Sequence, residues 1–265
     1  MAFITWLSAI LTMAVLVFIV GFIFVRGVPY IKPSLFSLTY NSENVSLMPA
    51  MISTVIMTAM SLLIAVPLGI FAAVYLTEYA KRGNKAVKLV RMTAETLSGI
   101  PPIVYGLFGL LFFVTYLGWG FSVLAGAFTL AIMILPLIIR SSEEALKSVP
   151  DTYREGAFGL GAGKLRTVFR IILPSAMPGI LAGIILSIGR IVGETAALIY
   201  TAGTVAQIPL SPMQSARTLS VHMYSLSSEG LHTNEGYATA VVLLAVVILI
   251  NTLSVKLAKR IGRMS

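Results

Sequence analysis

Residues 154–174 read REGAFGLGAGKLRTVFRIILP and place three glycines within five positions, directly followed by a lysine. Such a segment first suggests a phosphate-binding loop. A P-loop requires Gly, four residues and then Gly-Lys-Ser/Thr, but Gly163-Lys164 is followed by Leu165, and Phe158 stands where the first glycine belongs. The dinucleotide-binding fingerprint also fails, because no predicted strand precedes Gly159 and a third glycine is missing at the required spacing. The segment therefore serves a purpose other than nucleotide binding.

The composition indicates a membrane protein. Hydrophobic residues make up 57% of the 265 residues and charged residues only 11%, against about 25% charged in an ordinary soluble domain. The net charge of +9 does not indicate nucleic-acid binding, because the basic residues lie in the gaps between apolar runs. The chain has no cysteine, which excludes disulfides and thiol chemistry.

Six apolar runs approach the roughly 20 residues that a spanning helix needs. Pro67 and Pro136 fall inside two of them, which membrane helices tolerate. The first run is too long for a signal peptide and lacks a basic start and an A-x-A site, so a retained helix is predicted. The chain is thus predicted to be an all-α membrane protein with six transmembrane helices, at residues 3–25, 50–76, 100–117, 121–139, 179–203 and 237–255.

The distribution of basic residues predicts the orientation. Fifteen of the 19 Lys and Arg residues lie in the second-to-third gap, the fourth-to-fifth gap and the tail. The opposite side has only Arg26, Lys32 and Arg217, and Arg190 lies inside a span. The positive-inside rule then puts both termini in the cytoplasm.

The opening segment lies in the longest cytoplasmic gap, residues 140–178, and its local signals predict two short helices. Pro150 and Asp151 suit a helix start. Gly161 and Gly163 suit the break that follows, where a positive φ is often needed. A second helix is expected over 164–172, with Leu165, Val168, Phe169 and Ile172 on one side and with Pro174 and Pro178 ending it before the fifth span.

Two interpretations of this gap remain open on local physics. A basic connector is often only solvated. A partner-docking element is the alternative, because Phe158, Leu160 and Phe169 are more apolar than an idle loop requires.

At these residues the chain resembles the permease subunits of bacterial ABC importers, whose cytoplasmic signature is Glu-Ala-Ala, three residues, Gly, nine residues, Ile, one residue and Leu-Pro. One departure occurs, Gly156 for the first Ala. The resemblance implies a type I ABC importer permease fold in which the loop inserts into a separate ATPase subunit, with Glu155 and Gly161 at the centre of the contact. The matching positions are Glu155, Gly156, Ala157, Gly161, Ile171, Leu173 and Pro174.

Three further segments narrow the resemblance to the phosphate-specific (Pst) importers. They are SGIPPIVYGLFGL (98–110), LAIMILPLIIRSSEEALKSVP (130–150) and SIGRIVGETAALIYTAG (187–203), the last of which is most similar to the A-type permease. The implied organisation is an N-terminal helix and outward loop (1–49), a permease core (50–258) with the docking loop at 140–178, and a basic tail (259–265).

The resemblance also implies the partners. They are a C-type sister permease in a heterodimer, an ATPase dimer, an extracytoplasmic phosphate-binding protein and the lipid of the cytoplasmic (inner) membrane, with no nucleic acid. ATP and Mg are expected to be used by the ATPase, and no cofactor is expected on this chain.

Arg190 and Glu194 are unusual because both charges lie within the fifth apolar run, where a central charge costs about 2.5–3.5 kcal/mol on insertion scales. Four residues apart, they are expected to share one helix face. They are interpreted either as a structural ion pair or as a station on a substrate path, in which Arg190 contacts an oxyanion and Glu194 neutralises Arg190 when the site is empty. The family resemblance points to the same cluster.

Arg140 is predicted to close the fourth span as a snorkelling anchor or, on the Pst resemblance, to be a second positive group on the substrate path. Glu143 and Glu144 are in position to pair with it. His222 and His232 are too isolated to indicate a metal site. No catalytic triad or carboxylate pair can be assembled, so this chain is not expected to be an enzyme.

Three functions follow. The first is a phosphate ABC permease. The second is an ABC permease for another solute, such as sulfate, molybdate or a polar amino acid. The third is a secondary transporter or channel, which predicts inverted repeats that the sequence does not show.

Overall fold

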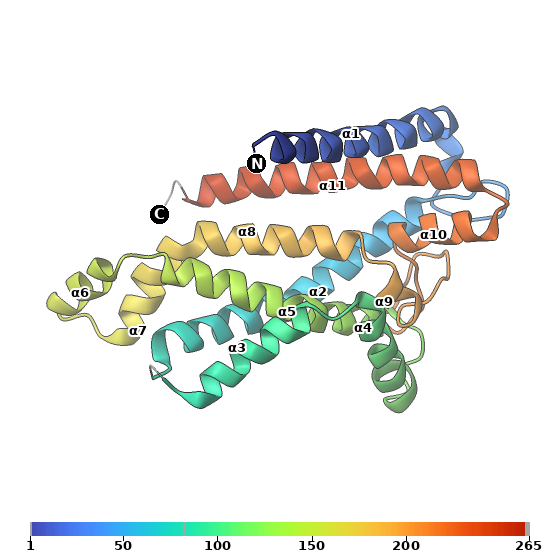
Figure 1. Cartoon of the computed structure of the whole chain (residues 1–265). Coiled ribbons are helices and arrows are strands. Elements are labelled where there is room, and N and C mark those ends of the chain that lie inside the picture. The colour runs from blue at the N-terminus through green and yellow to red at the C-terminus, as the bar shows by residue number, and fades with distance from the viewer. Residues whose placement is uncertain (1, 82, 263–265) are drawn as a thin grey trace.

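The computed structural model describes residues 2–81 and 83–262, and every regular element in these ranges is helical (Figure 1). Three of the elements, η3, η4 and η5, are π-helical segments. In chain order the elements are α1 (Ala2–Gly27), η1 (Val28–Tyr30), η2 (Pro33–Phe36), α2 (Met48–Val74), η3 (Tyr75–Tyr79), α3 (Lys85–Ser98), α4 (Pro102–Gly109), η4 (Leu110–Tyr116), α5 (Val123–Lys147), α6 (Asp151–Gly159), α7 (Lys164–Thr167), η5 (Val168–Ile172), α8 (Leu173–Val192), α9 (Ala196–Ile199), α10 (Leu219–Glu229) and α11 (Thr233–Gly262).

The described residues contain five helices that are long and apolar enough to cross a membrane, and a sixth if one bent pair counts as a single span. The predicted all-α membrane fold is therefore confirmed, and the predicted count of six is reached only with that pair. The five helices are Phe3–Tyr30, Met48–Tyr79, Val123–Lys147, Lys164–Val192 and Thr233–Lys256.

The third predicted span is not one straight helix. Its residues form Pro102–Tyr116, which makes an angle of 102° with the preceding helix Lys85–Ser98. The Pro101-Pro102 pair explains the break, since proline disfavours a helical conformation in the residue before it and Pro101 has an extended ψ of 140°.

The fifth predicted span is wrong at both of its ends. Pro174 does not end the second helix of the docking loop, because the helix runs from Lys164 to Val192. The π-turn η5 directly precedes the proline, and such a turn re-routes the backbone hydrogen bonds that a proline disrupts. Beyond Val192 the chain leaves the helix at Gly193 and resumes only in the short α9.

The core of the molecule forms around α5, the most buried of the candidate spans. Small residues allow its neighbours to approach closely, which is how membrane helices pack. A Cβ on Gly183 of α8 would lie 2.4 Å from the Cβ of Ser141 on α5, so only glycine fits there. A Cβ on Gly106 of α4 would lie 2.8 Å from Ala197 Cα, which fixes α9 against α4.

Figure 1 shows α1 lying alongside α11, with the first turns of α1 and the last turns of α11 on the side of the molecule that carries α6 and α7. The opposite end carries α10 and the connections around it. The predicted division of the chain at residues 49 and 258 stays a prediction. Of the predicted basic tail, residues 263–265 lie outside the described residues, as does Arg82.

Candidate functional site

The docking loop forms a helix–turn–helix projection at one end of the molecule, here called the knob (residues 150–172) (Figure 1). The first helix begins at Asp151 after Pro150, as the sequence predicts. Gly161 has φ +81°, which confirms the predicted positive φ after this helix. Gly163 differs, because it is the N-cap of α7 with an extended backbone of φ −70°.

The surface of the knob is apolar for a solvent-facing element. Leu160 is 91% exposed and Phe158 49% exposed, so both are free to contact a partner. The predicted single apolar side of the second helix is wrong, because its members divide between two faces. Val168 and Ile172 pack in the core, whereas Leu165 and Phe169 face outward.

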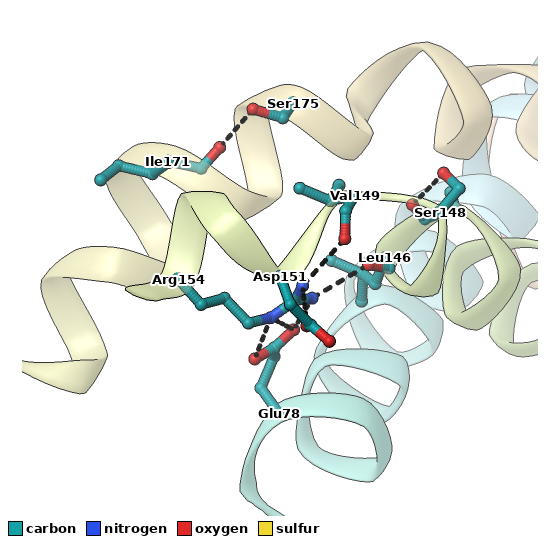
Figure 2. A network of polar contacts seen from close by, with 9 residues as sticks. Glu78, Leu146, Ser148, Val149, Asp151, Arg154, Ile171 and Ser175 are labelled. Carbon is teal, nitrogen blue, oxygen red and sulfur yellow. Dashed lines mark hydrogen bonds and ion pairs between the residues drawn. The ribbon is translucent and has the colours of Figure 1, made fainter. Parts of the chain in front are cut away.

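Arg154 fixes the knob to the rest of the molecule (Figure 2). Its Nη2 donates to Glu78 Oε1 at 2.6 Å and its Nη1 to Asp151 Oδ1 at 3.0 Å. The same guanidinium donates to the carbonyls of Leu146 and Val149 at 3.1 and 2.9 Å. The hydrogen bonds to the Glu78 carboxylate raise the pKa of Arg154 above its ordinary value, against the opposing effect of burial. Arg154 Nε also donates to the Glu78 carboxylate at 3.3 Å, so all five N–H donors of this side chain are used, and together they connect three helices.

The predicted docking residues surround this anchor. Glu155 and Gly156 are exposed, and a Cβ on Gly156 would meet nothing within 4 Å. Ala157 is buried, so its face of α6 is turned toward the rest of the molecule. The remaining positions lie in or beside η5, where the Ile171 carbonyl accepts from Ser175 Oγ at 2.7 Å (Figure 2); Leu173 and Pro174 are half-buried.

Arg190 and Glu194 do not share a helix face. Arg190 lies in the last turn of α8, and Glu194 follows the helix end at Val192. The Glu194 carboxylate, 7% exposed, accepts from the Ala197 N–H at 3.1 Å and so caps α9. The described part of the chain has no ion pair between the two residues. The structural-pair interpretation therefore loses its basis.

Arg190 instead lines an open cavity of about 810 Å³ between α5, α8 and α11. The other lining residues are Leu137, Ala182, Ile185, Leu186, Gly189, Asn251 and Val255. A guanidinium beside apolar walls is a suitable partner for an oxyanion, because its planar fork donates two parallel hydrogen bonds.

Arg140 is not among the residues that line the cavity of Arg190. The fourth predicted span does not end at Arg140, because α5 continues to Lys147. Arg140 Nε donates to Glu144 Oε1 at 3.1 Å in an exposed pair. The sequence predicted this pair from the four-residue spacing of the two side chains. Glu143 pairs with Arg91 at 3.0 Å and with Lys147 at 3.3 Å, and not with Arg140.

Two features were not found by sequence reasoning. The Glu78–Arg154 pair joins residues 76 apart, and only the position of Glu78 at the end of an apolar run hinted at it. Arg217 is 6% exposed and lies beside the equally buried His222, whereas the sequence treated both as outward-loop residues. No group of three His, Cys, Asp or Glu side chains in the described residues is arranged to hold a metal ion.

The chain is similar in sequence to several named proteins. The chain is 39% identical to "Probable ABC transporter permease protein YqgI" of Bacillus subtilis over 64% of this chain and 62% of that protein. It is 40% identical to "Phosphate transport system permease protein PstA 1" of Mycobacterium tuberculosis over 58% of this chain and 50% of that protein. With PstA of Pasteurella multocida the identity is 38% over 72% of each. The chain thus spans only about half to two thirds of the length of the first two relatives.

Solved structures share the fold. A bacterial alginate ABC transporter in complex with a pentasaccharide-bound periplasmic protein matches with a TM-score of 0.69 and 17% identity over 97% of this chain and 95% of that chain. The MetNI methionine ABC transporter matches with a TM-score of 0.62 and 19% identity over 81% and 94%. These matches confirm the type I ABC importer permease fold. Residues 65–263 match the family described as "Binding-protein-dependent transport system inner membrane component", and the chain belongs to this family.

Proposed function

We propose that this chain is the membrane permease subunit of an ATP-driven importer that carries inorganic phosphate into the cytoplasm. The observation that carries the proposal is the knob. It exposes Phe158 and Leu160 while Arg154 holds its base rigidly against Glu78, as a coupling element between two subunits requires.

The choice of phosphate rests on two further observations. Relatives named as PstA permeases are 37–40% identical to this chain. Arg190 lines the open cavity beside the break after α8, where its guanidinium suits an oxyanion. The solved structures are less than 25% identical and support the fold alone, so they favour neither phosphate nor the alternative of another solute.

Different subunits carry out the separate steps of this transport. This chain holds no P-loop, so ATP and Mg belong to a separate ATPase dimer that the knob contacts. A sister permease completes the membrane path, and an extracytoplasmic binding protein delivers the phosphate. Arg140, at an exposed position near the knob end of α5, is a second positive group for the departing anion.

Phosphate uptake by cells that express the whole system tests the function. Uptake should require this chain and ATP, and it should persist when the proton gradient is abolished. Sulfate in excess should not compete. Uptake that follows the proton gradient without ATP would indicate a secondary transporter, and competition by sulfate would indicate a permease for another solute.

Labelling tests the orientation, which places the knob and both termini in the cytoplasm. The chain has no cysteine, so single cysteines are unique labels. Leu160 in the knob and Leu210 between α9 and α10 are equally exposed, at 91% each. A membrane-impermeant maleimide added to intact spheroplasts should label Leu210→Cys and not Leu160→Cys. The reverse pattern would invert the proposed topology.

A further inference from the structure

Arg217 is a buried cation without an ionic partner. Only 6% of the residue is exposed, and its Nε and Nη2 have no hydrogen-bond acceptor among the described residues. No ion pair in that part of the chain involves it. Its guanidinium lies 4.6 Å from the centre of the Tyr40 ring, which compensates the charge only in part. Leaving buried donors unpaired is unfavourable, and more so for charged groups.

His222 belongs to the same cluster and faces the Val45 backbone. The residue is 1% exposed, and neither Nδ1 nor Nε2 has a hydrogen bond of acceptable geometry in the described residues. Burial, and next the charge of Arg217, lower its pKa to about 3, with a weak opposing contribution from the Val45 backbone. His222 is therefore neutral at physiological pH and offers one N–H donor. Its ring centre lies 6.1 Å from that of Tyr40.

The backbone that carries these side chains is held firmly. The Arg217 N–H donates to the Val205 carbonyl at 3.0 Å. The Leu219 N–H donates to Thr54 Oγ1 at 2.8 Å, which fixes the start of α10 on α2. Arg217 immediately precedes this 11-residue helix, whose N-terminus favours negative charge. The backbone at Arg217 and at the start of α10 is thus fixed, and both side chains lie beside Tyr40.

The cover of the cluster is strained. Val45 has φ +46°, a left-handed conformation that is a genuine outlier for a β-branched residue. Residues 41–46 hold it there through a turn in which the Asn41 and Asn44 side chains accept backbone N–H groups. Backbone strain of this kind is concentrated at ligand clamps and switch regions.

The cluster is connected to the break after α8. Ser220 Oγ, three residues beyond Arg217, donates to the Glu194 carbonyl at 2.6 Å. Figure 1 shows α10 at the end of the molecule opposite the knob. The start of α10, next to this cluster, is therefore bonded directly to the break that follows Arg190.

We infer that Arg217 and His222, covered by Tyr40, form a closed oxyanion-binding site at the outward entrance of the substrate path. The oxygens of the anion accept from Nε and Nη2 of Arg217 and from one imidazole N–H. The anion enters when the segment that carries Tyr40 and Val45 moves aside. The place of this site on a substrate path rests on the proposed function; the binding of an oxyanion does not.

Thermal unfolding of the purified full chain in detergent tests the site, with inorganic phosphate as the probe and chloride at equal ionic strength as the reference. The variant is Arg217→Met, and the matched control is Arg26→Met, an exposed arginine that also lies over an aromatic ring, at 5.7 Å from Phe22. All measurements are made in the Arg140→Gln, Arg190→Gln background, which removes the two other proposed anion partners.

In chloride, Arg217→Met should have a higher Tm than its parent, because the substitution removes an uncompensated buried charge. Phosphate should raise the Tm of the parent and of Arg26→Met in a saturable manner, and should not raise that of Arg217→Met. An equal phosphate-dependent rise in Arg217→Met would overturn the inference. A purely structural Arg217 predicts that equal rise.

Uptake by the complete importer separates this inference from the proposed function. Arg217→Lys should raise the KM for phosphate about tenfold or more, since it loses the fork of two donors. Absence of phosphate uptake with the wild-type chain would refute the proposed function and leave the unfolding experiment to decide the site. Wild-type uptake with an unchanged KM in Arg217→Lys, by contrast, would refute only the site.

Discussion

Arg154 Nη2 lies 2.6 Å from Glu78 Oε1, and this contact joins the knob to the end of the helix that begins at Met48. The side chains are only 17% and 9% exposed, so the pair is largely removed from water. Arg154 also satisfies the Leu146 and Val149 carbonyls at the end of α5 (Figure 2). One side chain therefore connects the knob to the ends of two candidate membrane helices.

Removal of one partner should destabilise the chain strongly. Arg154→Met strands the Glu78 carboxylate and two carbonyls, and breaking a buried pair in this way costs about 3–5 kcal/mol. The double variant Glu78→Leu with Arg154→Met should recover much of that loss, because no buried charge remains unpaired. Unfolding of the full chain in detergent measures both effects, and uptake should stay impaired in the double variant because the mechanical link is gone.

The exposed pair Arg140–Glu144 is the control for this experiment. Its side chains are 61% and 67% exposed, and i,i+4 pairs of this kind contribute about 0.3–0.5 kcal/mol. Arg140→Met should therefore hardly change stability. Equal losses in Arg140→Met and Arg154→Met would show that burial does not distinguish the two pairs.

Gly161 and Gly163 provide a matched test of the turn in the knob. A Cβ would meet nothing within 4 Å at either position, but Gly161 has φ +81° and Gly163 has φ −70°. Gly161→Ala should cost about 1–2 kcal/mol, the left-handed penalty for an L-residue, and should reduce co-purification of the ATPase subunit. Gly163→Ala should be neutral in both measurements. Full recovery of the ATPase with Gly161→Ala would show that the turn geometry is not needed for docking.

Gly156 occupies the one position at which the docking signature departs from its pattern. It is exposed within α6, and a Cβ there meets open space. Gly156→Ala should stabilise the helix by about 0.5–1 kcal/mol, because glycine loses more conformational freedom on folding than alanine. The change should raise the Tm without weakening ATPase co-purification. A lower Tm would contradict the expected gain in helix stability, and weaker co-purification would mean that the contact with the ATPase requires glycine.

Sequence reasoning located the elements of this chain better than their ends. Hydropathy identified every apolar run, and Gly161 was predicted correctly because a glycine after a helix carries a backbone signal. Runs of apolar residues do not reveal a break such as Gly193, because α8 before it and Ala196–Ile199 after it are apolar and only Glu194 and Thr195 interrupt the run. At Pro174 the opposite error occurred: the proline predicted a helix end, but the helix continues through it after the π-turn η5.

Contacts between residues far apart in the chain could not be predicted from the sequence. Glu78 and Arg154 are 76 residues apart, and no local pattern pairs them. The assignment of Arg190 and Glu194 to one helix face relied on continuous 3.6-residue periodicity, which the break after Val192 removes. Burial of Arg217 and His222 depends on the segment around Tyr40, whose packing has no periodic signature.

The stability of the chain should depend on pH through His222. Its pKa is lowered from 6.5 to about 3 by burial and by Arg217, so the unfolded chain binds a proton at mildly acidic pH and the folded chain does not. The free energy of unfolding should therefore fall as the pH drops from about 6.5 towards 3, by up to about 1.4 kcal/mol per pH unit. His222→Gln should flatten this dependence. The same substitution at His232, which is 32% exposed, should leave the dependence unchanged, and equal slopes for wild type and His222→Gln would contradict the assignment.

Glu194 is both a helix cap and a candidate charge on the substrate path, and two substitutions separate these roles. Its Oε1 accepts from the Ala197 N–H. Glu194→Gln keeps an acceptor at that position, so α9 should stay in place, whereas Glu194→Leu leaves a buried N–H without a partner and should cost about 1–3 kcal/mol.

If the negative charge offsets Arg190 during release of the anion, Glu194→Gln should slow phosphate uptake at unchanged Tm, because the anion stays longer on an uncompensated arginine. Arg190→Gln should abolish uptake, also with the fold retained. Exchange of the two residues, Arg190→Glu with Glu194→Arg, should fail as well, since the two side chains occupy different surroundings and do not pair. Wild-type uptake by Glu194→Gln would reduce Glu194 to its capping role, and near-normal uptake by the exchanged variant would remove both residues from the substrate path.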